Sequence, residues 1–234
     1  MTHQKNTAQT GFVKKLLAHA AMALCAMAAP AANANTADTP DSDSPGKRHS
    51  LETGLLIYAS DVTSVGVNFR YAYALGETNR LTFDLGACFD VDPKVTGHFA
   101  YHYSGSSITH YDGKIQVNHT IVPILIGWEY EWKLGNGNWA FHLGPVLGFA
   151  FVNGKEERNP RVTNASNTFR SDSGTAFLIG ANAGLRWNFI SADNRWFADF
   201  SLAALGGTDV KLDKLSEKIN LSGARIMTTV GFCF

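Results

Sequence analysis

The chain has 234 residues, of which 45% are hydrophobic, 12% aromatic and only 17% charged, and it contains 22 glycines. Charged residues make up about 25% of an average globular chain, so this composition favours a sheet-rich or membrane-embedded protein. The formal net charge is zero, and the chain therefore lacks the basic surplus that is typical of nucleic-acid-binding proteins.

The first 34 residues have the pattern of a secretory signal peptide. Lys14 and Lys15 precede the apolar stretch LLAHAAMALCAMAA, and the small residues of an A-x-A-like cleavage site follow it. We expect cleavage after Ala34 and, next, a polar flexible linker over residues 35–50. Residues 51–234 then form a single further domain.

From residue 51 onward the chain alternates in hydrophobicity with a period of two, which predicts β-strands. Eight stretches show the pattern: 51–60, 64–75, 80–91, 114–132, 138–152, 174–189, 195–205 and 224–234. No window of 18 residues is apolar throughout, so the sequence predicts no transmembrane helix. Short turns at 76–79, 133–137 and 190–194 alternate with longer segments at 92–113, 153–173 and 206–223. Short turns on one rim and long loops on the other are typical of bacterial transmembrane barrels.

The two faces of these strands differ in chemistry. One face carries apolar side chains such as Phe141, Phe177 and Phe200 and no charge. The other combines many glycines and Asn68, His142 and Asn182 with charged residues, namely Glu52, Arg70, Asp84, Glu129, Arg186, Asp199 and Arg225. A soluble barrel would point the apolar face inward, whereas a membrane barrel points it outward. Because glycine makes room for a neighbouring ion in a narrow lumen, we predict that the charges form a network inside the barrel.

The aromatic residues predict which rim lies in the periplasm. All five tryptophans, Trp128, Trp132, Trp139, Trp187 and Trp196, flank the second and third short turns. Indole prefers the membrane interface, so these rings and the terminal Phe234 predict an aromatic girdle at the short-turn rim. The last strand must pair with the first, since hydrocarbon cannot satisfy a free sheet edge.

The eight alternating strands, the stretch TIVPILIGWEYEW (120–132) and the ending ARIMTTVGFCF resemble the small outer-membrane β-barrel superfamily of the OmpA-transmembrane, OmpX and opacity-protein type. The resemblance implies an all-β, eight-stranded antiparallel up-and-down transmembrane β-barrel in the cell outer membrane, a monomer surrounded by outer-membrane lipid. It implies no conducting pore, no cofactor, no metal and a structural or surface-interaction role in adhesion or resistance. The terminal pattern is similar to the signal that the outer-membrane assembly machinery reads.

The stretch HFAYHYSGSSITHYDGK (98–114) predicts a surface hairpin that carries strands three and four past the membrane and turns near residues 104–107. Its named residues are His98, Phe99, Tyr101, His102 and Tyr103, and its exposed edge is suited to pairing with a strand of an unidentified surface ligand. The histidines His98, His102, His110 and His119 lack a spacing that would fix a metal site.

Two other functions are compatible with parts of the sequence. His102-Tyr-Ser104, followed by Asp112, is similar to the His-x-Ser motif of lipid A deacylases, although that family carries its motif late in the chain. A soluble periplasmic ligand-binding barrel is the other possibility, and it requires the apolar face to point inward.

Cys88 and Cys233 predict two buried thiols rather than a disulfide. Residues 153–173 predict a polar mobile loop, and residues 208–220 fit either a helix or an extension of a hairpin.

Overall fold

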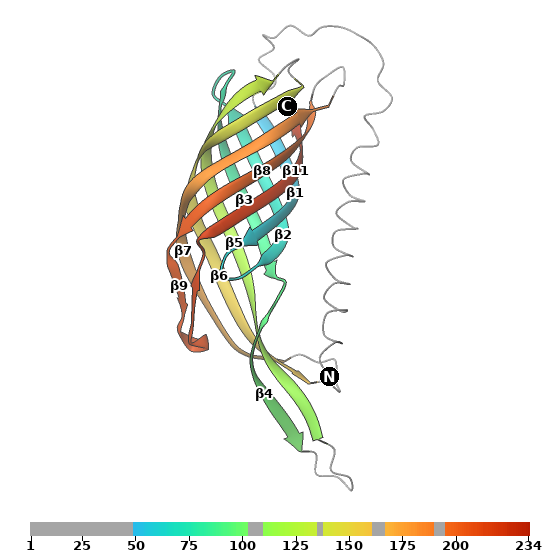
Figure 1. Ribbon diagram of the computed structural model, residues 1–234, viewed down its shortest axis with the longest axis vertical. Coiled ribbons are helices and arrows are strands. Elements are labelled where there is room, and N and C mark those ends of the chain that lie inside the picture. The colour runs from blue at the N-terminus through green and yellow to red at the C-terminus, as the bar shows by residue number, and fades with distance from the viewer. Residues whose placement is uncertain (1–48, 103–109, 135–137, 161–166, 190–194) are drawn as a thin grey trace.

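A computed structural model describes residues 49–102, 110–134, 138–160, 167–189 and 195–234 (Figure 1). Its strands are β1 (His49–Ala59), β2 (Ser64–Ala74), β3 (Asn79–Asp90), β4 (Lys94–His102), β5 (His110–Leu134), β6 (Trp139–Pro160), β7 (Asn167–Asn188), β8 (Trp196–Gly207), β9 (Asp209–Leu212), β10 (Glu217–Asn220) and β11 (Gly223–Cys233), with a short 3-10 helix η2 (Asp213–Leu215). None of the helices in these described ranges is long and apolar enough to cross a membrane.

Eight strands close into an antiparallel barrel. The ring runs β1-β2-β3-β5-β6-β7-β8-β11 and closes where β11 pairs with β1. The terminal residue takes part in the closure, because Phe234 N donates to the carbonyl of His49 at 2.8 Å and His49 N donates to the carbonyl of Phe234 at 3.2 Å. The strand pairing therefore confirms the predicted fold class, an eight-stranded antiparallel barrel.

Three strands continue well beyond the ring at the end opposite the carboxyl terminus (Figure 1). β5, β6 and β7 have 25, 22 and 22 residues, and β4 pairs with the extended part of β5. β3 does not run directly into the hairpin, because residues 91–93 separate it from β4. The expectation of a loop over residues 153–173 is wrong where the structure describes it, since the ladder between β6 and β7 continues to Arg158 and Asn167.

Pro123 and Pro145 interrupt the hydrogen-bond ladders of β5 and β6 without shifting the register of the strands. Between β5 and β6 the pairing passes from Gly127↔Val146 to Tyr130↔Leu143 with no extra residue on either strand. Pro145 lies in this gap, and its missing N–H explains the lost ladder bond. Pro123 likewise lies opposite a gap between β3 and β5. The two prolines therefore remove hydrogen bonds from the ladder without introducing a bulge.

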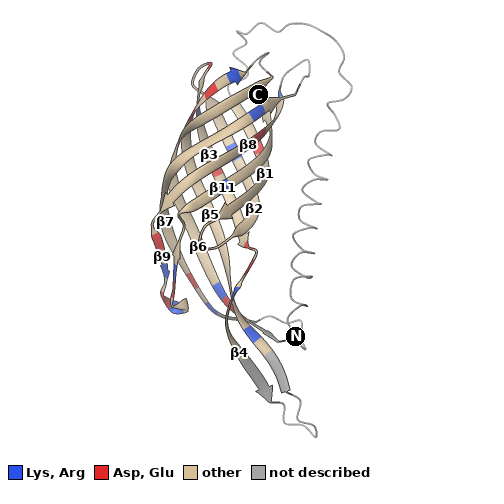
Figure 2. Cartoon of the chain, viewed as in Figure 1, with Lys and Arg blue, Asp and Glu red and all other residues tan. Residues whose placement is uncertain are grey.

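The barrel is inside-out relative to a soluble one. Phe141, Phe177 and Phe200 lie on the outer wall and are 37%, 40% and 53% exposed, whereas Arg186 and Asp199 are buried inside. Charged residues gather at the two ends and along the extended strands, and the wall between them is almost free of them (Figure 2). An apolar wall around buried charges fits a membrane barrel, so the soluble ligand-binding alternative is not supported.

Candidate functional site

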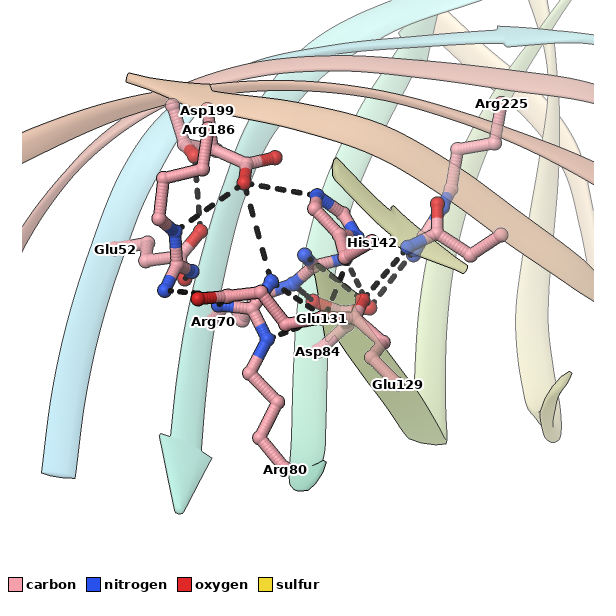
Figure 3. Close-up of polar contacts among 12 residues, drawn as sticks. Glu52, Arg70, Arg80, Asp84, Glu129, Glu131, His142, Arg186, Asp199 and Arg225 are labelled. Carbon is pink, nitrogen blue, oxygen red and sulfur yellow. Dashed lines mark hydrogen bonds and ion pairs between the residues drawn. The ribbon is translucent and has the colours of Figure 1, made fainter. Parts of the chain in front are cut away.

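The end of the lumen near the short turns holds a compact cluster of ions, which we call the lumen charge network (Figure 3). All seven residues that the alternation places inward lie there and are buried: Glu52, Arg70, Asp84, Glu129, Arg186, Asp199 and Arg225. They come from seven of the eight strands of the ring, one residue each from β1, β2, β3, β5, β7, β8 and β11. Arg70 and Asp84 are also direct partners in the ladder between β2 and β3. Strand alternation thus gathers residues that are far apart in sequence.

Asp84 and Glu129 are the two centres of the network. Asp84 accepts from Arg70 Nε at 2.6 Å and from Arg225 Nη2 at 2.8 Å. Glu129 accepts from Arg80 Nε at 2.7 Å and from Asn182 Nδ2 at 2.7 Å. Arg70 Nη1 lies 3.3 Å from Oε1 of Glu129. Each carboxylate therefore faces two guanidinium groups, which compensates the cost of burying its charge.

A second branch crosses the lumen toward the first strand. Arg186 Nη2 donates to Glu52 Oε1 at 2.9 Å, and Thr229 Oγ1 donates to the other oxygen of Glu52 at 3.0 Å. The guanidinium of Arg186 also lies 3.9 Å from the centre of the Phe197 ring. Bonds between residues 134 positions apart tie opposite walls of the barrel together.

Sequence reasoning missed Arg80 as a member of the network. Arg80 precedes Leu81, which opens the outward row of β3, so strict alternation would have placed it inside. Its guanidinium pairs with Glu129 at 2.6 Å and with the half-buried Glu131 at 3.3 Å. His142 also joins the ions, with Nε2 2.9 Å from Asp199 and Nδ1 3.5 Å from Glu129. Within the described ranges, four arginines thus meet five carboxylates.

The predicted girdle residues lie together at the short-turn rim. Trp128, Trp132, Trp139, Trp187, Trp196 and Phe234 point outward and are between 37% and 55% exposed. Trp139 stacks on Trp187 at 5.9 Å, and Phe234 stacks on His49 at 5.6 Å. A band of large amphipathic rings at one level is what an interface between hydrocarbon and water selects.

The outward rows also show where the hydrocarbon zone ends on the other side. Along β6 every outward residue from Trp139 to Phe151 is apolar, and the next two, Asn153 and Lys155, are polar and exposed. The level of residue 153 therefore marks the far boundary, and the strand extensions beyond it lie in water.

The predicted surface hairpin is built by β4 and the start of β5. His98 pairs with Lys114, Phe99 with Gly113, Tyr101 with Tyr111 and His102 with His110. Tyr103 and the expected turn near 104–107 lie outside the described residues, as does Ser104 of the lipid A motif. Asp112 pairs with Ala100 in the same ladder.

Two further expectations concern cysteines and histidines. Cys88 is buried, Cys233 is half-buried, and no disulfide joins them. His119 does not share a site with the hairpin histidines, because both of its ring nitrogens face carboxylates, as described below. No group of three or more potential metal ligands occurs among the described residues.

Comparisons with solved structures find similar chains at low sequence identity. The attachment invasion locus protein of Yersinia pestis is 16% identical, with 82% of this chain and 100% of that chain covered and a TM-score of 0.44. Neisserial surface protein A is 9% identical over 82% and 100%, with a TM-score of 0.43. The N-terminal β-barrel domain of Pseudomonas aeruginosa OprF is 16% identical over 81% and 99%, with a TM-score of 0.30.

No family model matches the chain, and no curated protein matches it. A second structure of the Yersinia pestis protein holds the heparin analogue sucrose octasulfate.

Proposed function

We propose that the chain is an outer-membrane barrel that conducts no solute and acts through the sheet that it displays outside the membrane. The observation that carries the proposal is the unequal length of the strands. β5, β6 and β7 extend past the hydrocarbon zone while β1, β2 and β3 end near it, so the extension is an open sheet that continues from the lower end of the closed cylinder in Figure 1.

The open sheet has a strand edge available for a partner. Among the described strands, β4 is the last in the order of the sheet and pairs only with β5. An unpaired edge in water presents backbone donors and acceptors that an extended peptide can complete. We therefore expect the surface ligand to contribute a strand along β4, through the hairpin that contains His98, Phe99, Tyr101, His102 and Tyr103.

The closed part of the molecule supports anchorage rather than transport. The lumen charge network fills the cylinder near the short turns, and apolar side chains fill it farther along, with Leu56, Ile121 and Leu178 fully buried. An eight-stranded interior is only wide enough to be filled by side chains. In planar bilayers we expect no stable conductance from the purified protein, and a reproducible open-channel current would contradict this part of the proposal.

A matched pair of variants tests the edge. Val95 on β4 pairs with Gln116 on β5, so Val95→Lys and Gln116→Lys add the same charge at the same level. Only the first blunts a free edge, because lysine on an edge strand opposes strand addition. Bacteria that display Val95→Lys should adhere less to an epithelial layer, and bacteria that display Gln116→Lys should adhere like those with the unaltered chain.

Deletion of residues 98–112 should abolish the adhesion if the hairpin carries it. If adhesion and serum survival were unchanged after this deletion while the protein kept its normal surface level, the proposed role of the hairpin in binding a surface ligand would be wrong. Mass analysis of lipid A from cells with and without the chain tests the enzymatic alternative, for which we expect no difference.

A further inference from the structure

The connection between β8 and β11 folds into a separate hairpin, Asp209–Asn220, which we call the lid. β9 pairs with β10, and η2 forms the turn between them. The lid follows β7 beyond the end of the ring, where β9 and η2 pack against that strand. It is thus a small second sheet at the extracellular end of the cylinder.

One side of the lid is apolar and belongs to the core. Val210, Leu212 and Ile219 are at most 4% exposed and join the cluster of Leu178 and Leu205 that fills this end of the lumen. Glycines on the facing strands leave space for them. A Cβ on Gly174 would overlap Val210, and one on Gly154 would lie 2.8 Å from Leu212 Cδ1.

The other anchor of the lid is ionic and centres on His119. This residue lies on β5 next to Thr120, the partner of Asn153, and therefore just beyond the hydrocarbon zone. Its Nδ1 is 3.1 Å from Asp90 Oδ2 at the end of β3, and its Nε2 is 3.0 Å from Glu217 Oε2 on the lid. The three side chains are at most 9% exposed.

With both carboxyl groups ionised, the two contacts of this triad require a doubly protonated ring. A neutral imidazole carries one N–H, so it can donate to one carboxylate but must turn a lone pair toward the other. An imidazolium donates to both. One carboxylate belongs to the barrel and the other to the lid, so the second proton is what joins the two parts through His119.

We infer that His119 is a proton-dependent latch that holds the lid on the extracellular end of the barrel. When the ring loses a proton, one of its two carboxylate contacts becomes repulsive, and the lid loses one of the polar contacts that add to the packing of its apolar side. The lid then opens more often and exposes Val210, Leu212 and Ile219 to water.

The electrostatic surroundings set the direction of the effect. Burial opposes the charged ring, but hydrogen bonds to Asp90 and Glu217 outweigh it and raise the pKa of His119. Because the pKa is raised in the latched state, the latch contributes fully below the ordinary histidine pKa and is lost as the pH rises through the higher, latched value.

Other charged groups near the latch leave this direction unchanged. Lys94 on β4 lies 3.2 Å from Glu217 Oε1 and holds that carboxylate independently of the ring. Asp61, Asp92 and Lys218 line the same cleft, which has a volume of about 370 Å³. On β7, Asp172 accepts the backbone N–H of Lys214 and is engaged by the lid itself.

Hydrogen exchange measured by mass spectrometry on the refolded protein in detergent micelles tests the latch. Peptides that cover 209–220 should lose about tenfold in protection, corrected for the intrinsic rate, as the pH rises through the titration of the ring, as expected for loss of one charge-assisted hydrogen bond. Peptides of β1 and β2 should not change.

Two variants and one direct measurement keep the test decisive. His119→Gln cannot titrate, so its lid should show low protection at every pH, while Lys94→Ala should lower the protection and keep the pH dependence. The imidazole resonance of His119 in the unaltered protein should titrate above about 6.5, the usual histidine value. Lid protection that does not vary with pH in the unaltered protein, or the same pH dependence in His119→Gln, would overturn the inference.

Discussion

Gly184 of β7 lies against the imidazole of His142 on β6, and a Cβ at position 184 would overlap atoms Nε2 and Cε1 of that ring. The two residues are paired across the ladder. The same relation joins Gly231 to the ring of Phe197. Inward glycines therefore provide the space that the larger lumen side chains occupy, as the alternation of glycine with ions predicts.

The first prediction concerns this space. Gly184→Ala should push His142 away from Asp199 and lower the free energy of unfolding by about 1–3 kcal/mol, the usual cost of overpacking. Urea unfolding in detergent, followed by tryptophan fluorescence, measures the change. Gly206→Ala is the control, because a Cβ there would meet only Ile179 O at 3.6 Å, and an equal loss in both variants would refute the steric explanation.

A second prediction concerns the buried carboxylate between two guanidinium groups. Asp84→Asn should leave Arg225 without the carboxylate it pairs with and Arg70 with Glu129 alone. We expect it to destabilise the barrel by about 3–5 kcal/mol, as removal of one partner of a buried pair does. Asp209→Asn removes an exposed pair with Lys218 and should change the unfolding curve little. If the two variants unfold alike, the lumen charges do not carry the stability assigned to them.

The girdle leads to a third prediction, on the depth of the tryptophans. In vesicles, lipids brominated near the headgroup should quench the fluorescence more strongly than lipids brominated near the chain ends, because all five rings lie at one interface. Leu147→Trp places an additional ring midway along β6, and this variant alone should gain a component that deep bromines quench. Strong quenching of the unaltered protein by the deep bromines would contradict the location of the tryptophan girdle at the membrane interface.

A fourth prediction separates the two contributions of the last residue. Phe234→Ala keeps the backbone bonds to His49 and loses the stacked ring, whereas deletion of Phe234 loses both. We expect refolding into detergent, measured by heat-modifiable migration, to be slowed slightly by the substitution and strongly by the deletion. Equal rates for the two variants would show that the closing hydrogen bonds contribute nothing.

Several features of the site follow from the local sequence. Strand alternation places Glu52, Asp84 and Asp199 on one face, because successive side chains of a strand point to opposite sides. The same rule places Arg80 inside, because it is the first residue of the stretch 80–91 and precedes the outward Leu81, although it was not among the inward charges named from the sequence. The strands of residues 153–173 were missed for another reason: both faces of an extension in water are polar, so no alternation marks it.

The sequence did not decide between a helix and a hairpin for the lid, because the stability of the hairpin depends on residues that are distant in sequence. Leu212 and Ile219 fit a helix or a hairpin equally well, and only packing against β7 and the apolar end of the lumen selects the hairpin. His119 is similar, since Asp90 and Glu217 are 29 and 98 positions away from it.

The sequence by itself determined the number of barrel strands, the side of each strand that faces lipid and the rim that carries the aromatic rings. These properties depend on the period of two and on the preference of each side chain for water, hydrocarbon or their interface. Only the tertiary structure decided which ions pair, how far the strands extend and where the lid rests. Those outcomes depend on the register and tilt of strands that close a ring, which bring together residues that no local pattern connects.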